Sequence, residues 1–127
     1  IDDIGTKEGW PEEYLRKNRE TTDVQRVGFT NAVKIGVKLA YGTDSGVYPH
    51  GQNAKQFAYM VRYGMTPMQA IQSATVRAAK LLGKEKMLGA IAAGRFADLV
   101  AVKENPLANI TALEHIALVM KDGKIVR

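Results

Sequence analysis

One helix is specified more clearly than any other element of this 127-residue chain, and it limits the folds open to the chain. Thr66 is a suitable N-cap, Pro67 occupies the first helical position, and Gln69 completes a Thr-x-x-Gln capping box. Apolar residues and several alanines then recur at helical spacing, and Gly83 follows as a helix stop. We therefore expect a helix over Thr66–Leu82 that packs closely against another helix or a sheet.

The segments before this helix alternate between helical and strand patterns. Pro11–Ile35 has helical spacing, with Thr21 or Thr22 as a candidate cap that would begin a second helix. Val37–Thr43 (VKLAYGT) is short, contains β-formers and ends in a Gly/Asp/Ser cluster, which predicts a strand. Gln52–Tyr63 is helical again, and glycines close the earlier helical stretches at Gly36 and Gly64. The order helix, linker, strand is half of an α/β unit, so we expect an α/β protein.

The last third of the chain predicts a small β unit. Its expected elements are a strand at Phe96–Val102, a short helical turn at Ile110–His115, and a hairpin of Ile116–Lys121 and Lys124–Arg127. The hairpin signal is the dipeptide Asp122-Gly123. Asp98 is unusual inside a strand, and we expect it to mark a bulge or to bond the backbone, without a catalytic role.

Composition excludes several classes of protein. Hydrophobic residues make up 46% and charged residues 24% of the chain, as in an ordinary single globular domain, and no apolar run is long enough to span a membrane. The chain has no cysteine, which excludes disulfides, thiolate zinc sites and cysteine nucleophiles. The net charge of +5 comes from scattered residues, without the basic block of a nucleic-acid site. We therefore expect a soluble protein that binds neither nucleic acid nor a membrane.

The chain begins at Ile1 and has no signal-like stretch. A start of this kind is typical of a piece of a longer protein, so its location stays open, with the cytoplasm slightly favoured.

Two residues near the predicted strand carry candidate chemistry. Asp44 follows the strand directly, where α/β barrels place catalytic groups and metal ligands, although an Asp in such a turn commonly bonds only backbone amides. His50 could contact a substrate or a metal, although a lone loop histidine is more often merely solvated. The only other histidine, His115, lies far along the chain, so the residues present complete no familiar zinc spacing.

Four ordered blocks of sequence carry a resemblance to a known family. They are GTDSGVYPHG, MVRYGMTPMQAIQSATVRAAKLLG, LGAIAAGRFADLVAVKENPL and VMKDGKIV. Together they resemble the C-terminal end of the amidohydrolase superfamily, and most closely the imidazolonepropionase-like enzymes, which include Xaa-Pro dipeptidases and related carboxypeptidases. The resemblance runs from about Glu12 to Arg127 and is much less specific for substrate than for the superfamily.

The resemblance implies the C-terminal fragment of a (β/α)8 barrel and part of a small β-sandwich. Residues 1–83 would be the last barrel helices and strand, with Val37–Thr43 as the eighth strand, and residues 84–127 would belong to the sandwich. In this family the aspartate after strand eight binds the metal and takes a proton from the attacking water, which by position is Asp44. His50 matches a Pro-His-Gly motif near the active site and is the expected substrate contact. The implied metal is zinc, which polarises the carbonyl and acidifies water.

The chain departs from the family in its length and in its ligands. A barrel takes about 250 residues, and the family's His-x-His pair, metal-bridging lysine and two later histidines are absent here. We therefore expect part of a hydrolase for amide C–N bonds, acting on Xaa-Pro dipeptides or acyl-amino acids and using one or two metal ions, with the chain alone inactive. Its expected partners are the substrate, the missing N-terminal barrel segment and a second copy in a homo-oligomer. The alternative is a non-catalytic truncated module that binds a partner through its open barrel surface.

Overall fold

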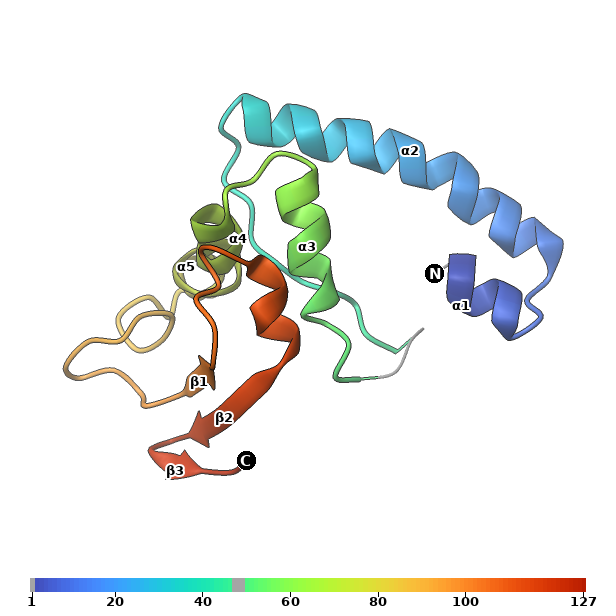
Figure 1. The fold of residues 1–127 in the computed structure, drawn as a ribbon. Helices are drawn as coiled ribbons and strands as arrows, with labels where there is room; N and C mark the ends of the chain where they lie inside the picture. Colours follow the sequence, from blue (N-terminus) through green and yellow to red (C-terminus); the bar gives the residue numbers. More distant parts are fainter. Residues whose placement is uncertain (1, 47–49) are drawn as a thin grey trace.

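The computed structural model describes residues 2–46 and 50–127, and in it helices precede a small sheet (Figure 1). The helices are α1 (Asp2–Lys7), α2 (Glu12–Lys34), α3 (Lys55–Arg62), α4 (Pro67–Ala74), α5 (Val76–Leu81) and the 3-10 helix η1 (Ile110–Glu114). The strands are β1 (Leu99–Val102), β2 (Ile116–Lys121) and β3 (Lys124–Ile125), in the sheet order β1-β2-β3. The expected order of helices followed by a β unit is confirmed.

Three helices end in the same hydrogen-bonded turn, at the predicted glycines. At the end of α2, the Gly36 amide donates to the Val33 carbonyl at 3.1 Å, and the next amide donates to the carbonyl five residues before it at 2.9 Å. This pair of bonds is the Schellman motif. Gly36 has a φ of +79°, which glycine adopts without the clash of a Cβ atom. The same bonds end α3 at Gly64 and α5 at Gly83.

α2 is one continuous helix, so the predicted start of a second helix at Thr21 or Thr22 is wrong. The two hydroxyls donate back to carbonyls of the preceding turn, Thr21 to Lys17 at 2.9 Å and Thr22 to Asn18 at 2.6 Å. Neither threonine is therefore available as a cap. α2 is 23 residues long, but no helix in the described ranges is both long and apolar enough to cross a membrane.

The predicted capping box is formed, whereas the predicted helix Thr66–Leu82 is interrupted. The Gln69 amide donates to Thr66 Oγ1 at 3.2 Å, and the Thr66 amide donates to Gln69 Oε1 at 2.9 Å. The helix breaks at Thr75 (φ −120°, ψ −96°), which separates α4 from α5. The Thr75 hydroxyl donates to the Ile71 carbonyl at 2.8 Å. Thr21 and Thr22 make the same kind of bond inside the continuous helix α2, so this bond alone does not account for the break.

Val37–Thr43 is not a strand, which corrects a prediction. The segment runs extended from α2 toward the loop, and no described strand pairs with it (Figure 1). A strand needs a neighbour that satisfies its backbone N–H and C=O groups. Here the Tyr41 amide instead donates to the Ser73 carbonyl on α4 at 3.0 Å. The sequence pattern predicted the extended backbone but could not reveal that its pairing partner is missing.

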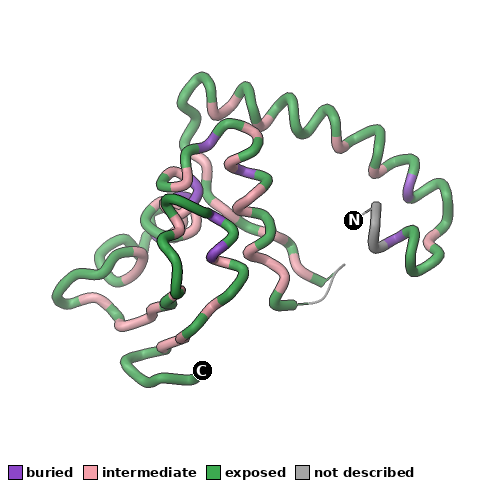
Figure 2. The backbone as a smooth tube through the Cα atoms, viewed as in Figure 1, coloured by how far each residue is buried: buried purple, intermediate pink, exposed green. Residues whose placement is uncertain are grey.

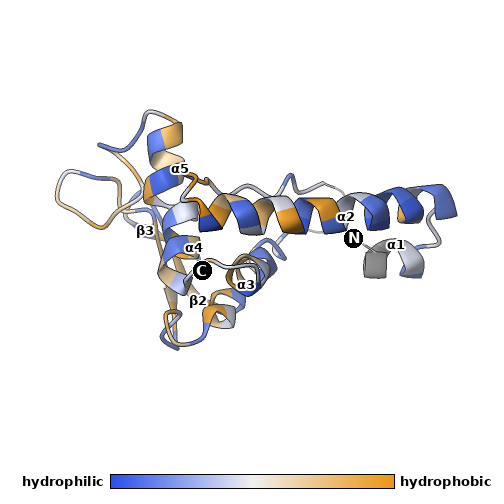
Figure 3. Ribbon diagram, turned by 90° about the horizontal axis from the view of Figure 1, so that it is seen from above, coloured by the Kyte–Doolittle hydropathy of each residue, from blue (hydrophilic) through white to orange (hydrophobic). Residues whose placement is uncertain are grey.

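The main core is small and lies where α3 and α4 meet the segment 37–43 (Figure 2). Met60, Met65 and Ala70 form its buried centre. The side chains packed around it are Phe29, Val33, Leu39, Tyr41, Phe57 and Val61. Large apolar side chains elsewhere are exposed, among them Val24 on α2 and Ile35 at its end. α2 extends away from α3, α4 and α5, and α1 lies beside its N-terminal part (Figure 3). The chain therefore leaves apolar faces that nothing in its described part covers.

The C-terminal β unit forms largely as predicted. β1 pairs antiparallel with β2, and β2 with β3, through the turn Asp122-Gly123, whose φ values of +50° and +74° fit a type I′ hairpin. Asp98, just before β1, accepts hydrogen bonds from the Lys121 ammonium group at 2.5 Å and from the Asp122 amide at 2.8 Å. These two donors, the ammonium first, lower the pKa of Asp98 from its ordinary value, although desolvation opposes them. The expected backbone-bonding role of Asp98 is confirmed.

Candidate functional site

Asp44 lies in the turn that follows the extended segment Val37–Thr43. Its side chain is exposed, and its φ of +48° is a left-handed conformation that Asp adopts more readily than most residues. Glycines two residues to either side, Gly42 and Gly46, leave the turn uncrowded. A carboxylate therefore stands at the carboxyl end of the extended segment, at the position where the sequence predicted a catalytic group.

The segment before Asp44 presents alternate side chains to opposite sides. Tyr41 is half-buried, and its ring stacks on Phe57 of α3 with the ring centroids 4.9 Å apart. Ala40 and Gly42 are exposed. Side chains of an extended chain alternate, but the positive φ of Asp44 ends this alternation, so the exposure of Asp44 comes from its turn. Ala40 and Gly42, on the exposed side of the segment before it, are both small.

Asn53 holds the two hydroxyl groups that flank Asp44. Its Nδ2 atom donates to Thr43 Oγ1 and to Ser45 Oγ, each at 2.7 Å, and these two oxygens lie 3.1 Å apart. The backbone carbonyl of Asn53 accepts a hydrogen bond from the Tyr41 hydroxyl. One amide side chain just before α3 therefore ties down the chain on both sides of Asp44.

His50 is exposed and lies in the same loop system. The amide of the next residue, Gly51, donates to Asn53 Oδ1 at 3.2 Å, so the backbone beside His50 is tied to the side chain that also holds the Asp44 turn. None of the contacts in the described ranges joins His50 to Asp44. Pro49 of the Pro-His-Gly motif lies outside the described residues.

Comparison with known proteins identifies the family. Residues 5–126 match the Amidohydrolase family. The chain belongs to the amidohydrolase family. It is 34% identical to the ochratoxinase of Aspergillus niger over 125 residues, which cover 94% of this chain and 26% of that enzyme. It is also 31% identical to the imidazolonepropionase of Shouchella clausii over 102 residues, 74% of this chain and 22% of that protein.

Solved structures agree with the sequence comparison. The crystal structure of a Xaa-Pro dipeptidase with bound methionine in the active site matches this amidohydrolase chain with a TM-score of 0.89 at 43% sequence identity. The match covers 99% of this chain and 32% of the dipeptidase. The chain thus spans about a quarter to a third of the length of its relatives. The resemblance inferred from the four sequence blocks and the expected amidohydrolase fold class are both confirmed.

The described part of this amidohydrolase does not contain a complete metal site. The superfamily generally uses divalent metal ions. Among residues 2–46 and 50–127, however, no group of three or more His, Cys, Asp or Glu side chains lies close enough together to hold an ion. Asp44 offers one carboxylate ligand, whereas a catalytic zinc site usually needs three protein ligands. Further ligands would have to come from outside the described residues.

Asn53 is the residue of this site that the sequence did not predict. In the sequence it is one polar residue of a loop rich in glycine and polar residues. The available signal is its place at the start of the predicted helix Gln52–Tyr63, where Asn side chains commonly bond nearby backbone and hydroxyl groups. Its link to Thr43 and Ser45 spans eight to ten residues, so it becomes visible only in the folded chain.

Proposed function

We propose that this chain is the C-terminal part of a metal-dependent amidohydrolase that hydrolyses amide C–N bonds. The observation that carries the proposal is the placement of Asp44, an exposed carboxylate at the carboxyl end of an extended segment that is backed by helices. In α/β barrels, catalytic groups lie at this end of the strands. Asp44 would serve as a metal ligand and would accept the proton of the attacking water. Asn53 would position Asp44 by holding the hydroxyls on either side of it.

The proposal also assigns the rest of the chain to the two domains of such an enzyme. Residues 1–83 would be the last helices and strand of the barrel, and residues 84–127 would be the C-terminal share of the small β-sandwich. Val37–Thr43 would become the eighth strand once neighbouring strands pair with it. The exposed side chains of Val24 on α2 and Ile35 at its end, 73% and 77% accessible, support a missing covering surface. The proposed partner is the N-terminal barrel segment, and pairing of two copies of this chain is the competing arrangement.

The proposed substrates are Xaa-Pro dipeptides or acyl-amino acids, and the proposed metal is zinc, as one or two ions. The 43% identity to a Xaa-Pro dipeptidase supports the dipeptide class. His50 is the proposed substrate contact, because its loop is tied through Asn53 to the turn that carries Asp44. The zinc ligands other than Asp44 would be supplied by the rest of the barrel.

The test uses the whole protein encoded by the reading frame that contains this chain. Purified protein is assayed against a panel of Xaa-Pro dipeptides and N-acyl-amino acids, with release of the free amino acid as the readout. Asp44→Asn should lower kcat/KM by about a thousandfold, because it removes the proton acceptor. Asp122→Asn is the matched control, since Asp122 is the other non-glycine residue described with a positive φ and lies in the hairpin. Full activity of Asp44→Asn would overturn the proposal.

The chain alone should be inactive and should retain almost no zinc. After dialysis against dilute zinc, elemental mass spectrometry should find near-zero metal in both the wild-type chain and Asp44→Ala. Stoichiometric zinc that is lost in Asp44→Ala would instead mean that a site is completed within the chain or across an assembly. The non-catalytic module would be favoured if the reading frame upstream encoded no apolar strand followed by His-x-His.

A further inference from the structure

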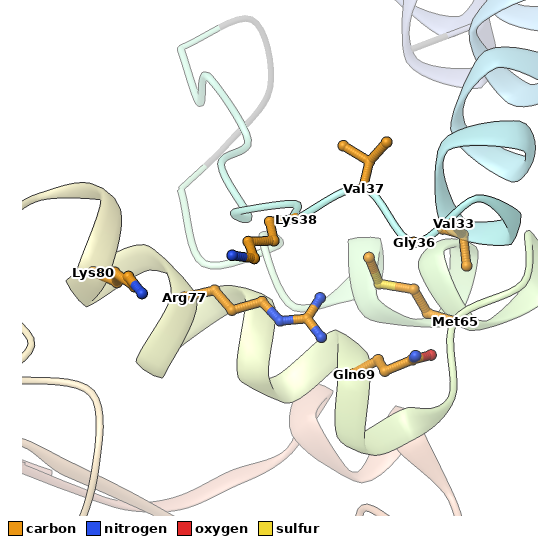
Figure 4. A pocket seen from close by; sticks show the side chains of 8 residues that line it. All are labelled: Val33, Gly36, Val37, Lys38, Met65, Gln69, Arg77 and Lys80. Carbon is orange, nitrogen blue, oxygen red and sulfur yellow. The ribbon is translucent and has the colours of Figure 1, made fainter.

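A hollow of about 260 Å³ lies at the end of the segment 37–43 that is remote from Asp44. Its lining residues are Val33, Gly36, Val37, Lys38, Met65, Gln69, Arg77 and Lys80 (Figure 4). They come from the end of α2 and the turn after it, the extended segment, the connection between α3 and α4, and the helices α4 and α5. Asp44 lies six positions after Lys38, which corresponds to about 20 Å of extended chain. The volume lies below the range of about 300–1,000 Å³ typical of small-molecule pockets, so it suits a small ligand.

The polar groups that line this hollow are hydrogen-bond donors. Lys38 and Lys80 are exposed and carry ammonium groups, whereas Arg77 is half-buried and its guanidinium extends toward Gln69 (Figure 4). Gln69 uses its Oε1 atom to accept the Thr66 amide in the capping box at 2.9 Å. Its Nε2 group remains, and this group can only donate.

No acceptor in the described part of the chain satisfies these donors. The ion pairs found there lie along α2 and at Lys121–Asp98, and none involves Lys38, Arg77 or Lys80. Three like charges around one hollow repel one another, and an anion between them offsets that repulsion. A guanidinium is also suited to bidentate recognition of oxyanions.

We infer that this hollow is a binding site for a small oxyanion of the phosphate class, held by Arg77, Lys38 and Lys80 with the Gln69 amide as a fourth donor. Half-buried Val33 and buried Met65 supply an apolar wall beside these donors, whereas Val37 is exposed. The site shares Val37 and Lys38 with the proposed eighth strand but uses no residue of the Asp44 turn, so phosphate binding and hydrolysis can be tested separately.

The test is a titration of the isotope-labelled chain with inorganic phosphate, followed by NMR at constant ionic strength maintained with sodium chloride. Saturable shifts should appear at the amides around Gly36–Lys38 and Arg77 and at the Arg77 Nε–H group, with a Kd on the order of 1 mM. Arg77→Gln should weaken binding by about tenfold, the loss of one charge-assisted contact. Lys124→Gln, which removes the same charge on the exposed strand β3, should leave the Kd unchanged.

Gln69→Glu provides a second variant that separates binding from folding. Glutamate at this position still accepts the Thr66 amide and so preserves the capping box. It also places a carboxylate among the three cations, so phosphate binding should be abolished while the unfolding temperature is maintained or raised. The proposed phosphate site would be overturned by shifts that fail to saturate or that chloride alone reproduces. It would also be overturned if the shifts persisted unchanged in Arg77→Gln and Gln69→Glu.

Discussion

Two segments of this chain have strand-like sequences, and only one of them becomes a strand. Leu99–Val102 pairs with β2, which begins only 14 positions after Val102, and Met120 of β2 lies opposite Leu99. Val37–Thr43 has equally suitable residues but runs beside helices, with no described strand as a neighbour. The difference lies in the available partners, since strand formation depends on the context of pairing and packing.

The two segments are therefore held by different forces. The β unit is stabilised by ladder hydrogen bonds, by the Asp122-Gly123 turn and by Asp98. The segment 37–43 is held by the packing of Leu39 and Tyr41 into the core and by one backbone bond to Ser73. A change that supplies strand pairing should affect only the segment 37–43, and a change in the α3–α4 core should release it.

The largest effect is expected in amide hydrogen exchange. The amides of Lys38 and Ala40 donate no hydrogen bond within the described ranges, so in the isolated chain they should exchange at nearly the unprotected rate. Pairing with the N-terminal barrel segment should slow their exchange by about a thousandfold or more, because opening would then require the strands to separate. Amides of β1 and β2 serve as the internal control and should change little. Strong protection at Lys38 in the isolated, monomeric chain would contradict the conclusion that the segment 37–43 has no strand partner there.

A core deletion should have the next largest effect. Met60 is 5% accessible and lies at the centre of the core, so Met60→Ala should lower the free energy of unfolding by about 2–5 kcal/mol. Met68, on α4, is 46% accessible, and Met68→Ala provides the matched control, with a loss below about 1 kcal/mol. Urea unfolding followed by circular dichroism gives both values. Equal losses in the two variants would mean that the core does not hold the segment.

The same contrast explains how far the sequence could be interpreted. The capping box at Thr66, the glycine stop at Gly36 and the Asp122-Gly123 hairpin each depend on residues a few positions apart, and all three were predicted correctly. The pairing of Val37–Thr43 depends on residues far away in the chain or outside it, and this prediction was wrong. The place of Asp44 at the end of that segment could be predicted.

The helix break at Thr75 and the hydrogen bonds of the Asn53 side chain to Thr43 and Ser45 could not be predicted. At the break, Gly89 packs against the Thr75 carbonyl, which is 2.7 Å from where a Cβ atom would lie, so the break includes a contact fourteen positions away. The Asn53 side chain bonds the Thr43 and Ser45 hydroxyls, which lie ten and eight positions before it. Both features depend on which distant groups meet after folding, and periodicity in the sequence does not encode this information.

Loss of the helix cap should have a smaller effect than loss of the core. Thr66→Ala removes the hydroxyl that accepts the Gln69 amide and should lower the free energy of unfolding by about 1 kcal/mol. Since α4 carries the Ser73 carbonyl that anchors Tyr41, exchange at the Tyr41 amide should also rise. Thr66→Ser keeps the hydroxyl and should stay near wild-type stability. If Thr66→Ser lost as much as Thr66→Ala, packing of the threonine methyl group would be responsible.

The smallest effect is expected in the β unit, where Asp98 accepts hydrogen bonds from Lys121 and from the Asp122 amide. The folded state lowers the pKa of Asp98 through the Lys121 ammonium group and the Asp122 amide, whereas the unfolded pKa is about 3.9. The charged form is therefore favoured by folding, and its contribution is fully present above the unfolded pKa. It is lost as the pH falls through the folded pKa of Asp98. Lys121 is largely exposed, so solvent screens the pair and the effect should be small.

Thermal unfolding of the wild type and Asp98→Asn, compared between about pH 6 and pH 2, isolates this contribution. The unfolding temperature of the wild type should exceed that of Asp98→Asn near neutral pH, and the gap should close below about pH 4, where the wild-type carboxyl becomes protonated. Asp122→Asn, in the same turn, should follow the wild-type profile, since the Asp122 group that bonds Asp98 is its backbone amide. A gap that stayed constant across this pH range would mean that the shape of Asp98, and not its charge, holds β1 to the hairpin.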